Sequence, residues 1–213
     1  MKQMMMILLL LLASVAQAQI SDEVKDILKK CSEKSQFSNG TEIDMKLRVS
    51  AVIASLNGTM KLCKKGDKSF SIIKMSVRDH EIYSESGYDG TQSWKYTKAA
   101  DKSERDTLTI TKGQIQKKEK FSLNMGLDKE YKKAKLKTTD KFYEITFSEP
   151  LSKDAPKKSI IRIVKDTYML HEYETKVSIA KMRMTITKIK LGVNDNVFVL
   201  DTKKYPNAVV VRK

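Results

Sequence analysis

Residues able to carry out catalysis are scarce in this 213-residue chain. It has two histidines, His80 and His171, which are far apart in the sequence. None of the patterns G-x-S-x-G, H-E-x-x-H, C-x-x-C, G-x-G-x-x-G or a Walker loop occurs. Asp79 and Glu81 flank His80, but two carboxylates beside one histidine in a turn are common and do not by themselves make an acid–base site. We therefore expect no enzymatic activity, no metal site and no cofactor.

The first eighteen residues predict a secretory signal peptide. Lys2 precedes an apolar run from Met4 to Ala13, and Ala16-Gln17-Ala18 has the small-x-small pattern of a cleavage site. The apolar run is too short to cross a bilayer as a helix, and an uncleaved anchor is the alternative. No lipid-attachment cysteine follows the run. We expect cleavage near Ala18, a mature chain over residues 19–213 that forms one domain, and export of that chain.

The chain has two cysteines, Cys31 and Cys63, and both fall in the exported part. An oxidising compartment favours a disulfide between them. In the chain-entropy model such a bridge would close a loop of about thirty residues and stabilise the fold by roughly 3–4 kcal/mol. The alternative is two buried thiols, because the sequence does not show whether the two Cα atoms come within bridging distance.

The elements that position these residues are one helix and a long antiparallel meander. After Ser21, apolar residues recur at helical spacing up to Cys31, which predicts a helix that ends near residues 34–37. From residue 42 onward apolar residues alternate with polar ones, which predicts about ten strands at the spacing of a barrel or a sandwich. Turns are expected at Asn57-Gly58, at residues 64–67 and at Asp89-Gly90. A second helix is expected within 113–125, and a strand over 197–200.

A sheet of this width has an apolar face that two short helices cannot cover. The sheet either closes on itself completely or curves and leaves an apolar cavity partly filled by the helices. Methionine is an adaptable side chain that is common at promiscuous apolar surfaces, although an ordinary core with methionine as a gap-filler is the alternative. Trp94 and Tyr96 share a strand face and belong either to a core or to the cavity wall. The residues predicted to line such a cavity are Met45, Leu47, Val49, Met60, Leu62, Met75, Trp94, Tyr96, Phe147, Ile163, Met182 and Met184.

The charge balance gives little support to nucleic-acid binding. The chain has 41 Lys+Arg against 26 Asp+Glu and a formal net charge of +15. Lysines far outnumber arginines, so few side chains could form bidentate contacts to phosphate. Lysines also alternate with apolar residues, as in Lys181-Met182-Arg183-Met184, which indicates a solvated strand face. A weak attraction to an anionic membrane surface is the remaining alternative to a simple role in solubility.

The sequence 88–96, YDGTQSWKY, resembles the "DGktxWxY" hairpin of the periplasmic outer-membrane lipoprotein carrier (LolA-like) family. The order of the surrounding features is similar: a signal peptide, an N-terminal helix and two long strands. The C-terminal segments 187–193, 197–200 and 205–209 are similar to the family's closing motifs. The resemblance covers essentially the whole mature chain. One departure is Cys63-Lys64-Lys65-Gly66, which stands where better-known members have an Arg-Pro pair.

This resemblance implies a fold and a function. The fold is mainly β, an incomplete antiparallel β-barrel with an N-terminal helix and a short helical lid over a hydrophobic cavity. The function is that of a soluble, monomeric periplasmic carrier that moves acylated lipoproteins or related lipids toward the outer membrane. Its partners would be an inner-membrane releasing transporter and an outer-membrane acceptor. A non-transport lipid-binding module of the envelope, such as a stress sensor or an interaction protein, is the alternative on the same scaffold.

Overall fold

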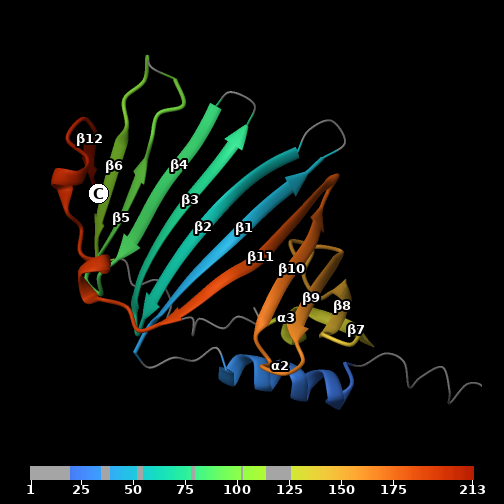
Figure 1. The fold of residues 1–213 in the computed structure, drawn as a ribbon. Helices are drawn as coiled ribbons and strands as arrows, with labels where there is room; N and C mark the ends of the chain where they lie inside the picture. The colour runs from blue at the N-terminus through green and yellow to red at the C-terminus, as the bar shows by residue number, and fades with distance from the viewer. Residues whose placement is uncertain (1–19, 35–38, 52–54, 78–79, 102, 114–125) are drawn as a thin grey trace, which may run out of the picture. The chain divides into compact units, whose positions relative to one another are not determined.

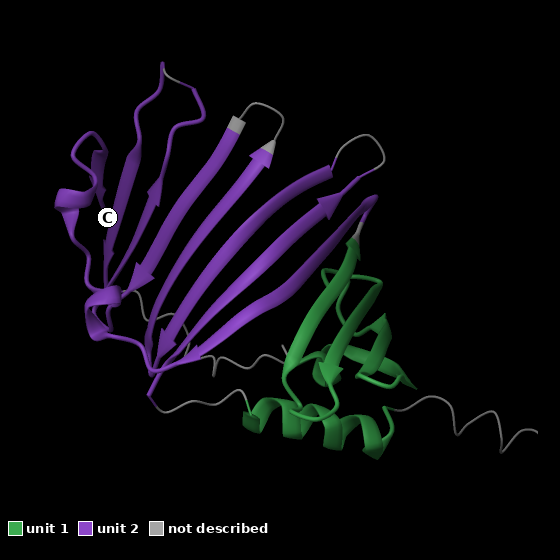
Figure 2. Ribbon diagram, viewed as in Figure 1, with its two compact units in different colours: residues 1–35, 122–177 green, residues 36–121, 178–213 purple. Residues whose placement is uncertain are grey.

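The computed structural model describes residues 20–34, 39–51, 55–77, 80–101, 103–113 and 126–213. These residues belong to two compact units, each assembled from segments that are distant in the sequence (Figure 2). Unit 1 takes residues 1–35 and 122–177, and unit 2 takes residues 36–121 and 178–213. The predicted signal peptide and nearly all of the helix predicted within 113–125 lie outside the described residues. The prediction of one domain over 19–213 stays a prediction.

Unit 1 is a four-stranded antiparallel meander with an amphipathic helix (Figure 1). Its helix α2 (Asp22–Lys34) begins after Ser21, whose hydroxyl oxygen accepts a hydrogen bond from the backbone N–H of Val24 at 3.3 Å. The helix buries its apolar stripe, Val24, Ile27, Leu28 and Cys31, as the helical spacing predicted. The other elements, in chain order, are α3 (Leu127–Glu130), β7 (Tyr131–Thr138), β8 (Phe142–Pro150), β9 (Lys158–Val164) and β10 (Leu170–Val177), with each strand paired to the next.

Unit 2 is an open eight-stranded sheet whose long strands curve together (Figure 1). The strand order is β12-β6-β5-β4-β3-β2-β1-β11, and all neighbours are antiparallel except β12 and β6, which are parallel. Within this unit the two outer strands, β11 and β12, do not pair with each other, so the sheet does not close. The strands are β1 (Thr41–Ser50), β2 (Ser55–Lys65), β3 (Lys68–Val77), β4 (His80–Tyr88), β5 (Gln92–Thr97), β6 (Thr107–Lys112), β11 (Ala180–Leu191) and β12 (Val209–Arg212).

The predicted mainly-β class with an open antiparallel sheet is confirmed. The turn at Gly66-Asp67 joins β2 to β3, and the turn at Asp89-Gly90 joins β4 to β5, as predicted. Asp89 stabilises its turn because its Oδ1 accepts hydrogen bonds from the backbone N–H groups of Thr91 (2.8 Å) and Gln92 (2.9 Å). The short helical lid over a cavity stays a prediction.

The predicted turn at Asn57-Gly58 is wrong, because both residues lie inside β2. Gly58 is paired with Leu47 in β1 and with Met75 in β3. A Cβ atom at Gly58 would lie 2.3 Å from the backbone oxygen of Lys74. The glycine therefore permits close approach of β3, and does not mark a reversal of the chain.

The predicted strand over residues 197–200 is also wrong. This region overlaps the end of the 3₁₀ helix η1 (Asp195–Phe198), and a second 3₁₀ helix, η2 (Thr202–Lys204), comes soon after it. The side chain of Asn194 accepts a hydrogen bond from the backbone N–H of Asn196 at 3.0 Å, which favours a turn over an extended strand. Asp195 then fixes the segment to the β2–β3 hairpin through Lys65 (2.7 Å) and Lys68 (2.9 Å).

Candidate functional site

One face of the sheet in unit 2 collects most of the residues predicted to line a cavity. Paired residues on neighbouring strands share a face, and successive residues alternate, so the strand register assigns every side chain to a face. Met45 is paired with Met60 and Ile186, and Leu47 is paired with Met184. We call this surface the methionine face, and it carries eight of the predicted residues: Met45, Leu47, Val49, Met60, Leu62, Met75, Met182 and Met184.

The register adds apolar residues that the sequence analysis did not single out. Ile43, Leu56, Ile73 and Ile186 are paired with members of the methionine face and therefore lie on it. The signal for Ile43 was present, because it continues the alternation of β1. Leu56 was missed because the predicted turn at Asn57-Gly58 ended the strand too early.

Exposure increases along the part of the methionine face that β1 contributes. Near the β2–β3 turn, Ile43 is 1% exposed and Met45 is 4% exposed. Leu47 and Val49 are half-buried, and Met182, the partner of Val49, is 36% exposed. We call this exposed end of the sheet, at residues 46–50, 55–59, 75–76, 81–82 and 180–185, the open end. A continuous apolar row that is exposed at one end offers a binding surface to an apolar chain.

Trp94 and Tyr96 lie on the opposite face from the methionine face. Trp94 is paired with Gly87, which is paired with Phe70, and Phe70 with Cys63. By alternation Cys63 and its neighbour Leu62 point to opposite faces. The predicted strand therefore places Trp94 and Tyr96 together, as expected, but does not bring them to the methionine residues.

The surroundings of Trp94 are those of a core residue. Trp94 is 4% exposed, and it belongs to a buried cluster with Leu108, Ile110 and Tyr205. Its ring centroid lies 6.2 Å from that of Tyr205, which comes from the C-terminal segment. A Cβ atom at Gly87 would lie 2.5 Å from the indole Cε2, so the glycine makes room for the ring. Of the two interpretations left open by the sequence, this geometry favours the core.

Tyr96 helps to hold the C-terminal segment on this side of the sheet. Its ring stacks on Tyr205 at 4.5 Å, and the Tyr205 hydroxyl donates a hydrogen bond to Glu85 at 2.7 Å. The Tyr96 hydroxyl donates to Asp106 at 2.5 Å. Burial, together with this hydrogen bond, raises the pKa of Tyr96 to about 12, and the same bond lowers the pKa of Asp106. Each hydroxyl in this network has a structural partner, so the network stabilises the fold.

Phe147 and Ile163 lie in unit 1 and not on the methionine face. Both are fully buried, and Phe147 packs its ring 5.7 Å from that of Tyr131. The Tyr131 hydroxyl donates to the backbone oxygen of Pro156 at 2.8 Å and also contacts the Ser159 hydroxyl at 2.8 Å. These two predicted residues therefore contribute to the core of unit 1.

The two cysteines are buried, and neither is in a disulfide. Cys31 lies on α2 in unit 1, and Cys63 lies on β2 in unit 2, where it packs with Val193 and Phe198. Burial raises the pKa of the Cys63 thiol to about 11, so little thiolate forms at neutral pH. The structure corresponds to the alternative of two buried thiols.

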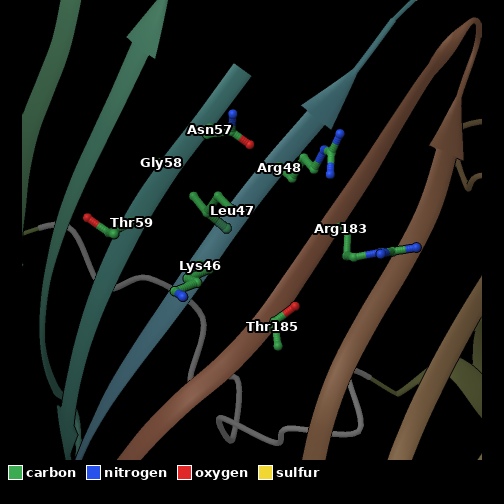
Figure 3. Close-up of a pocket in the computed structure, with 8 residues that line it drawn as sticks. All are labelled: Lys46, Leu47, Arg48, Asn57, Gly58, Thr59, Arg183 and Thr185. Atoms are coloured by element: carbon green, nitrogen blue, oxygen red, sulfur yellow. The ribbon is translucent and has the colours of Figure 1, made fainter. Parts of the chain in front are cut away.

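A shallow depression of about 480 Å³ lies across β2, β1 and β11 (Figure 3). The strand register places six of its lining side chains on the face opposite the methionine residues. The other two lining residues, Leu47 and Gly58, lie between these six along β1 and β2. The six are Lys46, Arg48, Asn57, Thr59, Arg183 and Thr185. The sequence analysis treated these lysines and arginines only as a solvated strand face.

Two kinds of feature are absent from the part of the chain that the structure describes. It contains no group of three or more His, Cys, Asp or Glu residues placed to hold a metal ion. None of its helices combines the length and the apolar character needed to cross a membrane.

Comparison with known proteins places the fold. No protein-family model matches the sequence, and no curated protein does. Among solved structures, LprF from Mycobacterium bovis matches with a TM-score of 0.51 at 11% identity over 83% of this chain and 97% of that chain. The chain has a LolA-like fold.

Two further structures resemble this LolA-like fold less well. The lipoprotein LppX from Mycobacterium tuberculosis matches with a TM-score of 0.49 at 12% identity, over 82% of this chain and 99% of that chain. A LolA superfamily protein from Nitrosomonas europaea matches with a TM-score of 0.36 at 11% identity, over 83% of this chain and 97% of that chain. At such identities the likeness concerns the fold, and function must be argued from the residues of this chain.

Proposed function

We propose that this protein is a periplasmic carrier that binds the acyl chains of lipoproteins or related lipids on the methionine face and moves them toward the outer membrane. The observation that carries the proposal is the methionine face itself. It is a continuous apolar surface across four strands, and along β1 it runs from the buried Ile43 and Met45 to the half-buried Leu47 and Val49. The LolA-like fold supports the same conclusion.

The chemistry of the face suits reversible binding of a chain. Each methylene group taken out of water gains about 0.8 kcal/mol, so an acyl chain does not leave a membrane for water unaided. Methionine side chains are flexible and polarisable, and they can adapt to chains of different shape. The face therefore binds by apolar contact without a fixed set of hydrogen bonds, which allows release as well as uptake.

The proposal assigns no chemical reaction to the protein. It needs a donor at the inner membrane and an acceptor at the outer membrane, in keeping with the signal peptide predicted at residues 1–18. Other carriers have an Arg-Pro pair where this chain has Cys63-Lys64-Lys65-Gly66, which forms the end of β2 and the start of the β2–β3 turn. Other residues must therefore take over the role of that pair in this protein.

Binding can be tested with a fluorescent apolar dye and a long-chain fatty acid as competitor. The double variant Leu47→Gln/Met184→Gln changes two paired, half-buried residues of the methionine face. We expect weaker dye binding by about fivefold for each residue, which corresponds to roughly half the burial energy of such a side chain. Leu151→Gln, at an exposed leucine of unit 1, is the matched control and should bind dye like the unchanged protein.

Transport needs a separate measurement. Radiolabelled lipid should move from donor to acceptor vesicles faster when the protein is present, and protein purified from its own envelope should carry lipid or lipoprotein in native mass spectrometry. A well-folded protein that binds no dye would overturn the lipid-binding proposal. Lipid binding without accelerated transfer would instead support the non-transport envelope module.

A further inference from the structure

Charges are segregated along the face of unit 2 that lies opposite the methionine face. Near the β2–β3 turn, acidic and basic residues are in contact: Lys61 donates to Glu42 at 2.5 Å and lies 3.3 Å from Asp44. The hydrogen bond from Lys61 lowers the pKa of Glu42, so that carboxylate is ionised at neutral pH. This end of the face therefore mixes acidic and basic residues, and Lys188 and Lys190 of β11 are paired with Asp44 and Glu42 there.

At the open end, the same face of β1, β2 and β11 has basic residues and no acidic ones. Lys46 and Arg48 come from β1, and Lys181 and Arg183 come from β11. Arg48 and Arg183 are direct cross-strand partners, so their side chains lie on the same face of the sheet. These two arginines and Lys46 line the depression, together with the neutral polar side chains of Asn57, Thr59 and Thr185 (Figure 3). An anion placed there would accept hydrogen bonds from the exposed side chains of Lys46 and Arg48.

Exposed apolar side chains occur at the same end of the sheet. Ile179, in the turn that leads into β11, is 68% exposed. Met182 is 36% exposed, and Ile82, the partner of Met75, is 45% exposed. A basic patch beside protruding apolar residues is the combination that peripheral proteins use at membranes, where cations meet phosphates and apolar groups enter the interface.

We propose that the open end of unit 2 docks on the surface of an anionic phospholipid bilayer. Lys46, Arg48 and Arg183 contact the lipid phosphates, while Ile179 and Met182 enter the interfacial layer. A soluble phosphate compound would satisfy the cations but would leave the apolar residues in water, so the lipid surface fits both observations. Because Met182 belongs to the methionine face, an acyl chain could pass from the bilayer to that face at the point of docking. The proposal rests on the lipid-binding function proposed above and names the surface from which the chain is taken.

Vesicle co-sedimentation tests the docking. The full mature chain should bind vesicles that mix phosphatidylcholine with phosphatidylglycerol, and should bind pure phosphatidylcholine vesicles much more weakly. Near an anionic surface each basic residue contributes about a fivefold factor in affinity, so Lys46→Gln/Arg48→Gln should bind about 25-fold more weakly. Lys203→Gln/Lys204→Gln, in η2, removes the same charge elsewhere and should bind like the unchanged protein. Added salt should weaken binding of the unchanged protein.

Further variants keep the outcome interpretable. Thermal unfolding checks that Lys46→Gln/Arg48→Gln is folded, and Arg183→Gln provides a second test of the same depression if it is not. Ile179→Asn keeps every charge and should reduce vesicle binding without changing dye binding. Equal loss in the Lys203→Gln/Lys204→Gln control would show that net charge alone attracts the protein, and would overturn the assigned surface. Binding of inorganic phosphate without binding of anionic vesicles would overturn it in favour of a soluble anion.

The dye assay separates this proposal from the proposed function. Dye displacement by fatty acid together with no binding to anionic vesicles overturns the docking surface and leaves lipid binding in place. Vesicle binding that depends on Lys46 and Arg48, together with no dye binding, supports the docking surface and overturns the carrier function.

Discussion

Trp94 gives the sharpest test of how the two faces of the unit 2 sheet divide their roles. It is the single tryptophan of the chain, so its emission reports on one place. The structure puts it in a buried cluster on the face opposite the methionine residues. We therefore expect a brominated fatty acid to bind the protein without quenching Trp94.

The geometry sets the size of both expected effects. Trp94 lies on β5, two strands away from Met75 on β3, which at the usual strand spacing is about 10 Å, and the sheet itself separates their side chains. Because Trp94 is a core residue, its replacement by alanine should lower the free energy of unfolding by about 3–5 kcal/mol. For a chain of this length that lowers Tm by about 6–20 °C. Trp94→Phe keeps a ring and removes an indole N–H that has no hydrogen-bond partner among the described residues, so it should cost roughly 1–2 kcal/mol.

The assay compares two positions for one fluorophore. Brominated fatty acid is titrated into the unchanged protein and into a Met184→Trp variant made in the Trp94→Phe background. We expect saturable quenching at position 184, on the methionine face, and none at Trp94. Dye displacement confirms in both cases that lipid is bound. Saturable quenching of Trp94 itself, or a stability loss below about 1 kcal/mol in Trp94→Ala, would refute the assignment of this residue to the core.

Three further outcomes follow from single contacts. Gly58→Ala would place a Cβ atom 2.3 Å from the backbone oxygen of Lys74. It should destabilise the protein by about 1–3 kcal/mol, as measured by chemical denaturation. An unchanged denaturation midpoint would contradict the close approach of β2 and β3. Tyr96→Phe removes the hydrogen bond that lowers the pKa of Asp106. The unchanged protein should therefore be more stable than the variant at neutral pH, and this difference should disappear as the pH falls below about 4 and through the lowered pKa of Asp106. Tm values of both proteins measured against pH test this. The Cys63 thiol should resist iodoacetamide in the native state, because it is buried and has a pKa of about 11, and should react fully in denaturant without reductant; no labelling in denaturant would indicate a disulfide.

The alternation of most strands was readable from the sequence. Residues of alternating polarity predict a strand with two different faces, and glycine beside aspartate at 66–67 and 89–90 predicts a tight turn, because both preferences are local properties of the chain. The helix that ends near Lys34 follows from apolar spacing and from Ser21 for the same reason. The apolar residues of the methionine face were mostly found in this way, since each strand shows its own alternation.

The faces that neighbouring strands share were decided by the tertiary structure alone. Alternation orders side chains within one strand, but a shift of one residue in pairing moves a whole strand's apolar set to the other face. Met75 and Trp94 look equivalent in the sequence, and the pairing of β3, β4 and β5 puts them on opposite sides. The same pairing places Gly58 inside a strand and sets Arg48 directly against Arg183. These relations depend on contacts between residues far apart in the chain, which is why the sequence specified the pieces of the surface and only the folded sheet determined which of them meet.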